Sequence, residues 1–302
     1  MQGLATYIMR GRSQAALVAS ATAVLSLVVP LVGLISSAVV ALVTMRQGPT
    51  EGLIVGLFAG LASGLFAYAA LGSPLPAVGF ALALWLPVWV LGLVLRNTRS
   101  LALTVQLASL IGLVIVLGLR LWVGDPVLYW AETLEPIRES LVQGEVIEAE
   151  ASHALVAEIA RWMTGAFAAT FYFQALLALF LGRWWQSLLY NPGGFGEELR
   201  ALRLSKGIAL LGLALLLLLA VGVESRAAVE LLLLLTPLLF LQGLAVAHWL
   251  VHALKLARGW LIGFYALLVL AMPHAEILVA GLGLADILMD VRARVRPRGS
   301  GD

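Results

Sequence analysis

Eight apolar runs divide the chain, and their lengths are those of helices that cross a membrane. The runs cover residues 15–44, 51–71, 76–95, 101–123, 162–181, 208–223, 227–254 and 260–289. A straight helix crosses the hydrocarbon core of a bilayer in about 20 residues. The first run would extend roughly 45 Å as one helix, so the first and last runs are each too long for a single span.

A proline near the middle of each long run predicts a break there. Pro30 removes a backbone donor from the first run. The last run carries the polar sequence Pro-His-Ala-Glu at 273–276, which is typical of a loop tip. Splitting both runs gives ten helices. The pattern therefore predicts an all-α, polytopic transmembrane bundle of about ten helices, some of them short, built as a single membrane domain over residues 1–302.

The basic residues support this count, because they gather before the first helix and after every second one. Fifteen of the nineteen lysines and arginines follow this pattern: Arg10, Arg12, Arg46, Arg96, Arg99, Arg183, Arg200, Arg203, Lys206, Lys255, Arg258, Arg292, Arg294, Arg296 and Arg298. Only Arg138 and Arg161 accompany the acidic residues of the long segment on the opposite side. The acidic residues of segment 124–160 fall on the opposite side. By the positive-inside rule, both termini and a basic tail at 291–302 are cytoplasmic. We therefore expect a multi-pass protein of a bacterial inner membrane, with segment 124–160 outside.

Composition excludes a soluble domain. Hydrophobic residues make up 62% of the 302 positions, charged residues 12%, and the mean hydropathy is +1.00, a balance that needs a lipid bilayer as partner. The chain has no cysteine, which excludes disulfides and thiolate chemistry. Because the first apolar run continues well past Ala19-Ser20-Ala21, we expect no cleavable signal peptide.

Segment 124–160 alternates acidic and apolar residues. Asp125-Pro126 is a helix-start signal, and Gly144 interrupts the following helical pattern. We expect two short amphipathic helices on the outer membrane face, the second running on towards Trp162. The segment would form either an interfacial cap or a lid whose acidic surface favours a cationic or metal-bearing ligand.

Trp184 and Trp185 precede segment 187–206. The segment itself contains Tyr190, followed by an Asn-Pro-Gly-Gly turn. Beyond the turn, Phe195, Leu199 and Leu202 share one helical face while charged residues take the other. This pattern predicts an elbow helix in the cytoplasmic interface. The elbow is either structural or a docking surface for a partner, formed by Asn191, Pro192, Gly193, Gly194 and Phe195.

Small residues recur every fourth position in two helices: Ala15, Ala19 and Ala23 in the first, and Gly56, Gly60 and Gly64 in the third. Such rows allow two helices to approach closely. The glycine row fits packing within the chain. The alanine row lies on a terminal helix, where it could instead accept a helix of another subunit.

Few polar residues lie inside the apolar runs. Gln106, Gln174 and Gln242 fall at mid-depth and would bind a ligand or form interhelical hydrogen bonds. Arg120, Glu224, Arg226 and Glu230 lie near the outer interface and can snorkel. Asp286 falls one to two turns before Arg292 and Arg294, so we expect it to be paired. We therefore assign Asp286, Asp290 and Arg292 to a structural charge cluster.

His248 and His252 share one helical face, but a metal site needs a third ligand and no H-E-x-x-H motif is present. The chain contains no Ser/His/Asp set, no paired mid-membrane carboxylates and no Rossmann signature. We therefore expect no enzyme, no metal, no cofactor and no nucleic-acid partner.

Two stretches resemble a known family. The sequence Tyr190-Asn191-Pro192-Gly193-Gly194-Phe195, with Glu198 and Leu202-Arg203-Leu204, is similar to the proteobacterial branch of the YybS-like family of bacterial membrane proteins, whose function is undetermined. Gly281 to Asp286, with Asp290 and Arg292, resembles the ending of that family.

The first third of the chain more distantly resembles the substrate-binding subunits of energy-coupling-factor transporters. The resemblance rests on Pro30-Leu31, the sequence Arg-Gln-Gly-Pro-Thr-Glu-Gly at 46–52, and the glycine row. It implies a bundle that binds a small molecule, and a membrane coupling subunit that contacts the alanine row. We therefore expect a protein that binds or transports a small metabolite. The alternative is a scaffold that binds other envelope proteins and transports nothing.

Overall fold

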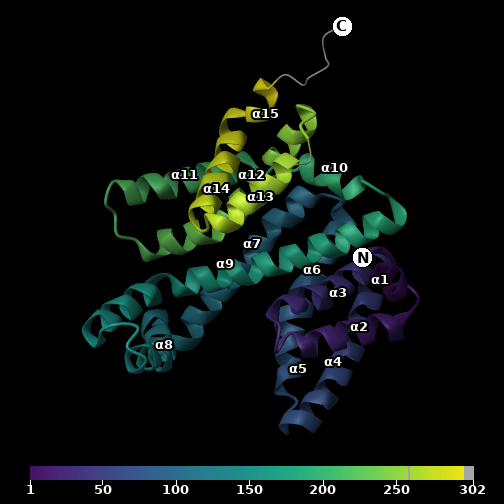
Figure 1. The fold of residues 1–302 in the computed structure, drawn as a ribbon, viewed down its shortest axis with the longest axis horizontal. Helices are drawn as coiled ribbons and strands as arrows, with labels where there is room; N and C mark the ends of the chain where they lie inside the picture. Colours follow the sequence, from purple (N-terminus) through teal and green to yellow (C-terminus); the bar gives the residue numbers. More distant parts are fainter. Residues whose placement is uncertain (258, 296–302) are drawn as a thin grey trace. The chain divides into compact units, whose positions relative to one another are not determined.

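The computed structural model describes residues 1–257 and 259–295, and within these ranges the chain is helical apart from short connections, with no strand (Figure 1). Of the predicted basic residues, Arg258, Arg296 and Arg298 lie outside the described residues, as does the rest of the tail beyond residue 295. The all-α prediction is confirmed.

The chain divides into two compact units. Unit 1 comprises Met1–Ala108 and Phe171–Leu202. Its helices are α1 (Gln2–Ile8), α2 (Arg12–Leu25), α3 (Gly33–Gln47), α4 (Pro49–Leu71), α5 (Leu75–Phe80), α6 (Leu86–Thr98), the start of α7 (Leu101–Val123), the end of α9 (Ala149–Tyr190) and α10 (Gly194–Arg200). A π-helical segment, Ala81–Trp85, joins α5 to α6.

Unit 2 comprises Ser109–Thr170 and the described part of Arg203–Asp302. Its helices are the rest of α7, α8 (Pro126–Gln143), the first part of α9, α11 (Lys206–Ala220), α12 (Arg226–Ala253), α13 (Gly259–Leu270), α14 (His274–Met289) and α15 (Val291–Arg294). The chain leaves unit 1 within α7 and returns to it within α9.

Among the described residues, six helical stretches are long and apolar enough to cross a membrane. They are Pro30–Gln47, Pro49–Leu71, Leu75–Thr98, Leu101–Val123, Ala149–Tyr190 and Arg226–Ala253. The prediction of about ten spans additionally needs the shorter apolar helices α2, α11, α13 and α14. Both long runs are broken as predicted: α2 ends at Leu25 before a 3₁₀ turn at Pro30–Val32, and α13 ends at Leu270 before α14 begins.

Helix α3 forms the core of unit 1. Residues 36–45 are all buried, because α2, α4 and α6 pack around this apolar helix. Close contact requires glycines on the neighbours: a Cβ at Gly52 would lie 2.0 Å from Thr44 Oγ1, and one at Gly182 would lie 2.9 Å from Ala38 O. Buried Ser36 links three elements, since its hydroxyl donates to Ala19 O at 2.7 Å and accepts from Trp85 Nε1 at 2.9 Å.

Helices α12 and α14 form the core of unit 2. Each contributes a glycine at their crossing, where a Cβ on Gly243 would lie 1.9 Å from Val279 O and a Cβ on Gly283 would lie 2.0 Å from Leu239 O. The backbones therefore touch, as small residues permit in membrane helices.

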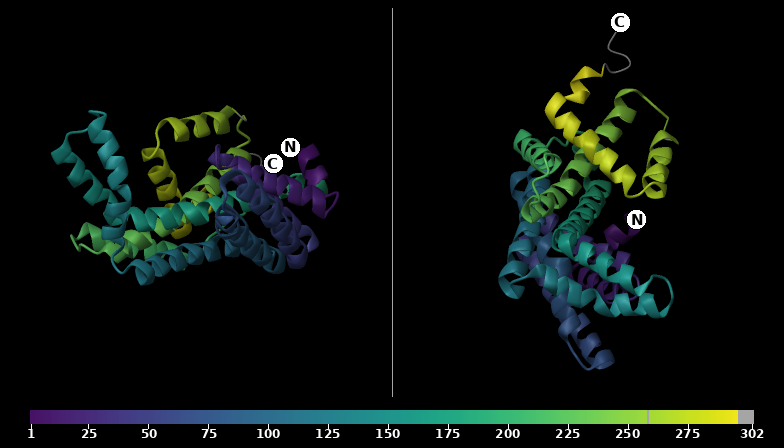
Figure 2. Two further views of the ribbon diagram at one scale, coloured as in Figure 1. Left: turned by 90° about the horizontal axis from the view of Figure 1, so that it is seen from below. Right: turned by 90° about the vertical axis from the view of Figure 1, so that its left-hand side faces the viewer.

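In the acidic segment α8 ends at Gln143, beside the predicted break at Gly144, whereas the second predicted helix is not short: it is the first part of the 42-residue α9. Figure 2 shows α8 folding back beside the first turns of α9. The Asp125 side chain caps α8 by accepting from Val127 N at 2.9 Å. Arg138 joins the two helices, because it pairs with Glu135 and donates to Ser152 Oγ at 3.1 Å. The hydrogen bond from Arg138 lowers the pKa of Glu135.

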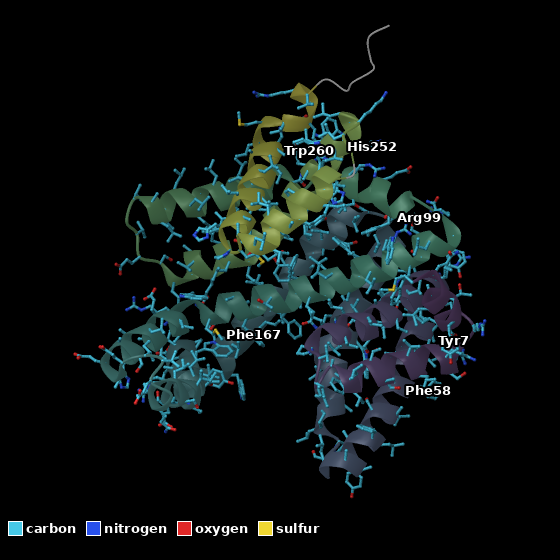
Figure 3. All side chains as sticks on the ribbon, viewed as in Figure 1. Tyr7, Phe58, Arg99, Phe167, His252 and Trp260 are labelled. Atoms are coloured by element: carbon cyan, nitrogen blue, oxygen red, sulfur yellow. The ribbon has the colours of Figure 1, made fainter. Side chains whose placement is uncertain are left out.

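Large apolar side chains cover much of the surface of both units. Phe58 in unit 1 is half exposed and Trp260 in unit 2 is about two-thirds exposed (Figure 3). No residue of α13 is buried. A soluble monomer does not expose apolar surface of this extent, so lipid is the solvent for which these helices are suited.

Candidate functional site

Unit 1 contains a polar pocket at the ends of α3 and α6, with a volume of about 710 Å³. We call it the arginine pocket. Its lining residues are Met45, Arg46, Leu95, Arg96, Asn97, Arg99, Arg183, Gln186 and Glu198. The volume is typical of a site for a small molecule, which occupies about 300–1,000 Å³.

Helix termination places the arginines in this pocket. Helix α3 ends before Gly48, whose φ of 122° is readily adopted by glycine. Helix α6 ends at Thr98 and is capped by Arg99, whose φ is 52°. Arg46 and Arg96 lie in the last turns of these helices. Cations in that position are favoured by the partial negative charge of a helix C-terminus.

Two bonds from α6 hold the turn between α3 and α4 beside the pocket. Arg96 Nη1 donates to Met45 O at 2.8 Å, and Trp89 Nε1 donates to Pro49 O at 2.9 Å. Arg46 stacks on the other side, with its guanidinium carbon 4.0 Å from the centre of the Tyr190 ring. The turn and the two arginines are therefore positioned by the fold of unit 1.

Arg183 of α9 and Glu198 of α10 form a bidentate pair at the pocket wall. Arg183 Nε donates to one carboxylate oxygen at 3.0 Å and Nη2 donates to the other, while Nη1 donates to Gln186 Oε1 at 3.1 Å. Within the lining, four arginines face one carboxylate, and Arg46, Arg96 and Arg99 are exposed. The pocket is therefore electrostatically suited to an anion.

The three glutamines predicted at mid-depth lie in both units. Gln106 lies in unit 1 and donates to Ala102 O of its own helix at 3.0 Å. Gln174 is partly buried in α9 of the same unit. Gln242 belongs to unit 2.

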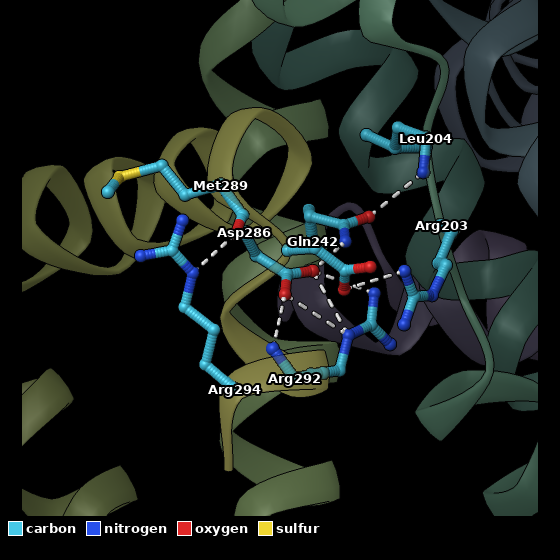
Figure 4. A network of polar contacts seen from close by, with 8 residues as sticks. Arg203, Leu204, Gln242, Asp286, Met289, Arg292 and Arg294 are labelled. Atoms are coloured by element: carbon cyan, nitrogen blue, oxygen red, sulfur yellow. Dashed lines mark hydrogen bonds and ion pairs between the residues drawn. The ribbon is translucent and has the colours of Figure 1, made fainter.

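Gln242 instead bridges parts of unit 2 (Figure 4). Its amide donates to Asp286 Oδ2 at 2.7 Å and its carbonyl oxygen accepts from Leu204 N at 3.0 Å. This residue is 1% exposed. Gln242 therefore forms the interhelical hydrogen bond that the sequence offered as one of its two roles.

The predicted pairing of Asp286 is confirmed. Arg292 Nη2 lies 2.8 Å from Asp286 Oδ2, and both side chains are at most 2% exposed. Arg294 donates to Met289 O instead. Asp290 pairs with Arg203 at 2.9 Å on the surface, where both side chains are about half exposed. Of the two aspartates in the predicted charge cluster, Asp286 therefore forms a buried ion pair and Asp290 forms an exposed one.

The alanine row faces the interior of unit 1. Ala15, Ala19 and Ala23 are each at most 1% exposed, because α2 packs on α3 and α4. Docking of another subunit through these residues is therefore not supported by the structure. In the glycine row, Gly60 and Gly64 lie near Trp85 and Ala77, whereas a Cβ at Gly56 would meet nothing within 4 Å.

In the predicted elbow, the turn residues Asn191, Pro192 and Gly193 are exposed, while Gly194 is buried. Phe195 is partly buried and packs on Phe180, with ring centroids 5.7 Å apart. His248 Nε2 lies 2.8 Å from Tyr265 Oη. Within the described ranges, no group of three or more metal-ligating side chains occurs.

Sequence reasoning missed two features. The pocket arginines were interpreted only as topology markers, although their clustering at helix ends was visible. Arg120 and Glu230 were assigned to the interface, yet Glu230 is 4% exposed and pairs with Arg120 at 2.6 Å. Gly165 lets α9 approach the backbone of α12 at this point, because a Cβ there would lie 3.0 Å from Glu230 Cα.

Residues 17–287 match the family described as "Predicted membrane protein (DUF2232)". The chain belongs to this family. The DUF2232 match begins within α2 and ends within α14, so it includes every residue of the arginine pocket and Asp286. No curated protein and no solved structure matches the chain. Membership of DUF2232 and the apolar helices together identify a membrane protein.

Proposed function

We propose that this protein binds or transports a small anionic metabolite, and that the arginine pocket of unit 1 is its binding site. The observation that carries the proposal is the excess of positive charge on a pocket of about 710 Å³. Arginines that line a concave pocket present several charged donors to one anion, which supports a polar, negatively charged ligand. The resemblance to substrate-binding subunits of energy-coupling-factor transporters agrees with this role.

The proposal includes the orientation derived from the basic residues. We propose a multi-pass protein of about ten spans in a bacterial inner membrane, with both termini cytoplasmic and segment 124–160 outside. The pocket arginines then face the cytoplasm. A ligand would reach the pocket from that side.

Cysteine labelling tests the orientation, since the chain contains no natural cysteine. We expect Ser140→Cys, exposed on α8, to react with a membrane-impermeant maleimide in intact cells. Ser205→Cys, exposed between α10 and α11, is the matched control and should react only after permeabilisation. The reverse pattern would overturn the orientation.

Native mass spectrometry of the gently purified full-length protein tests the binding role. We expect a retained anionic small molecule, lost from Arg99→Gln because a cation of the pocket is removed. Arg10→Gln removes the same charge from a position outside the pocket and should leave the retained molecule in place. Equal retention by both variants would contradict the assignment of the site.

The second candidate is a scaffold that binds an envelope or cytoplasmic protein through Asn191–Phe195. The exposure of Asn191, Pro192 and Gly193 supports this alternative. Because these residues lie outside the lining of the arginine pocket, their substitution should disturb a protein partner without affecting the small molecule.

A further inference from the structure

We infer that the arginine pocket takes a phosphate group, and that Glu198 competes with this group for Arg183. The inference rests on the proposed function, which requires only a small anion. It adds the chemical class of the ligand and a residue that limits its affinity.

Three arginines of the pocket keep N–H groups for a ligand, since Arg96 uses only Nη1 for Met45 O and Arg46 stacks on the Tyr190 ring through its face. Within the described ranges, Arg46, Arg96 and Arg99 lie beyond ion-pair distance of any carboxylate. They come from the ends of two helices, α3 and α6. A group with several acceptor oxygens can meet more than one of them.

The pair between Arg183 and Glu198 shows how the pocket holds an anion. Both carboxylate oxygens accept from the same guanidinium, which is the two-pronged geometry that arginine offers equally to phosphate. Arg183 is 15% exposed, whereas Glu198 is 36% exposed. Glu198 can therefore turn towards water while Arg183 stays in place.

Helix α10 would remain attached after Glu198 leaves. Phe195 N donates to Ser187 Oγ at 3.2 Å, and the Phe195 ring packs on Phe180. These contacts do not involve Glu198. Competition at Arg183 thus needs only a side-chain rotation.

Charge favours phosphate over a carboxylate. With Glu198 counted, the four pocket arginines leave an excess of three positive charges. A phosphomonoester carries about −1.5 to −2 charges at pH 7 and three acceptor oxygens, whereas a carboxylate carries one charge and two oxygens. The group could belong to a soluble organophosphate or to a lipid headgroup, which share this chemistry.

Calorimetric titration of the full-length protein in phosphatidylcholine nanodiscs tests the inference, with glycerol 3-phosphate as probe and glycerate as the carboxylate control at equal ionic strength. We expect glycerate to bind at least about tenfold more weakly. Arg99→Gln should weaken glycerol 3-phosphate binding by about tenfold, and Arg10→Gln should leave it unchanged. Equal binding of the two probes would overturn the inference.

Glu198→Gln supplies a result that a purely structural role would not produce. Removal of the competing charge should tighten glycerol 3-phosphate binding by roughly three- to tenfold. Unchanged or weaker binding would show that Glu198 does not compete.

A second set of nanodiscs containing phosphatidic acid distinguishes the sources of phosphate. If phosphatidic acid binds and glycerol 3-phosphate does not, the phosphate inference holds and the soluble-metabolite function fails. If native mass spectrometry instead finds a retained carboxylate and neither phosphate binds, the inference fails and the proposed function stands.

Discussion

Replacing Gly283 by leucine is expected to destroy the packing of α14 against α12. A Cβ at this position would lie 2.0 Å from Leu239 O and 2.8 Å from Gly243 N, and backbone atoms cannot move aside as a side chain can. The helices must separate, which also removes the contact of Gly243 with Val279. We expect the free energy of unfolding to fall by about 3 kcal/mol or more, measured by thermal unfolding of the detergent-solubilised protein.

Gly281→Leu is the matched control, because it makes the same substitution two residues earlier in the same helix. Gly281 is exposed, and a Cβ there meets nothing within 4 Å. This variant should keep the stability of the original chain or gain the roughly 1 kcal/mol by which glycine disfavours a helix. If both variants unfold at the same temperature, the close approach of α12 and α14 is wrong.

Asp286→Asn is expected to destabilise unit 2 strongly. The substitution leaves the buried Arg292 guanidinium without its carboxylate and weakens the bond from Gln242. Loss of one partner of a buried ion pair typically costs about 3–5 kcal/mol, since the remaining charge is uncompensated. Thermal unfolding of the full-length protein measures the effect.

Asp290→Asn provides the comparison, since it removes the same charge four residues later. Asp290 has a φ of 48°, a conformation that asparagine also tolerates. Its pair with Arg203 is about half exposed, and such surface pairs contribute at most about 1 kcal/mol. Comparable losses in the two variants would mean that burial of Asp286 does not raise the contribution of its ion pair.

Local features of the fold could be predicted from the sequence. The breaks near Pro30, Gly144 and Pro273, the cap at Asp125 and the pairing of Asp286 with Arg292 all depend on residues within about two turns of one another. Hydrophobic content and run length sufficed to predict membrane helices, since a bilayer demands both. Membership of DUF2232 supports the same class.

Long-range features were decided only by the tertiary structure. The arginine pocket combines residues from Met45 to Glu198, and Arg120 pairs with a glutamate 110 positions away. The alanine row was compatible with docking until α3 and α4 were seen to cover it. In a membrane protein the lipid-facing and core-facing positions are both apolar. The sequence by itself therefore determined that the chain forms apolar helices and that they break near Pro30, Gly144 and Pro273. Only packing decided which faces meet and which charges gather, because hydrophobicity does not distinguish lipid from protein as a neighbour.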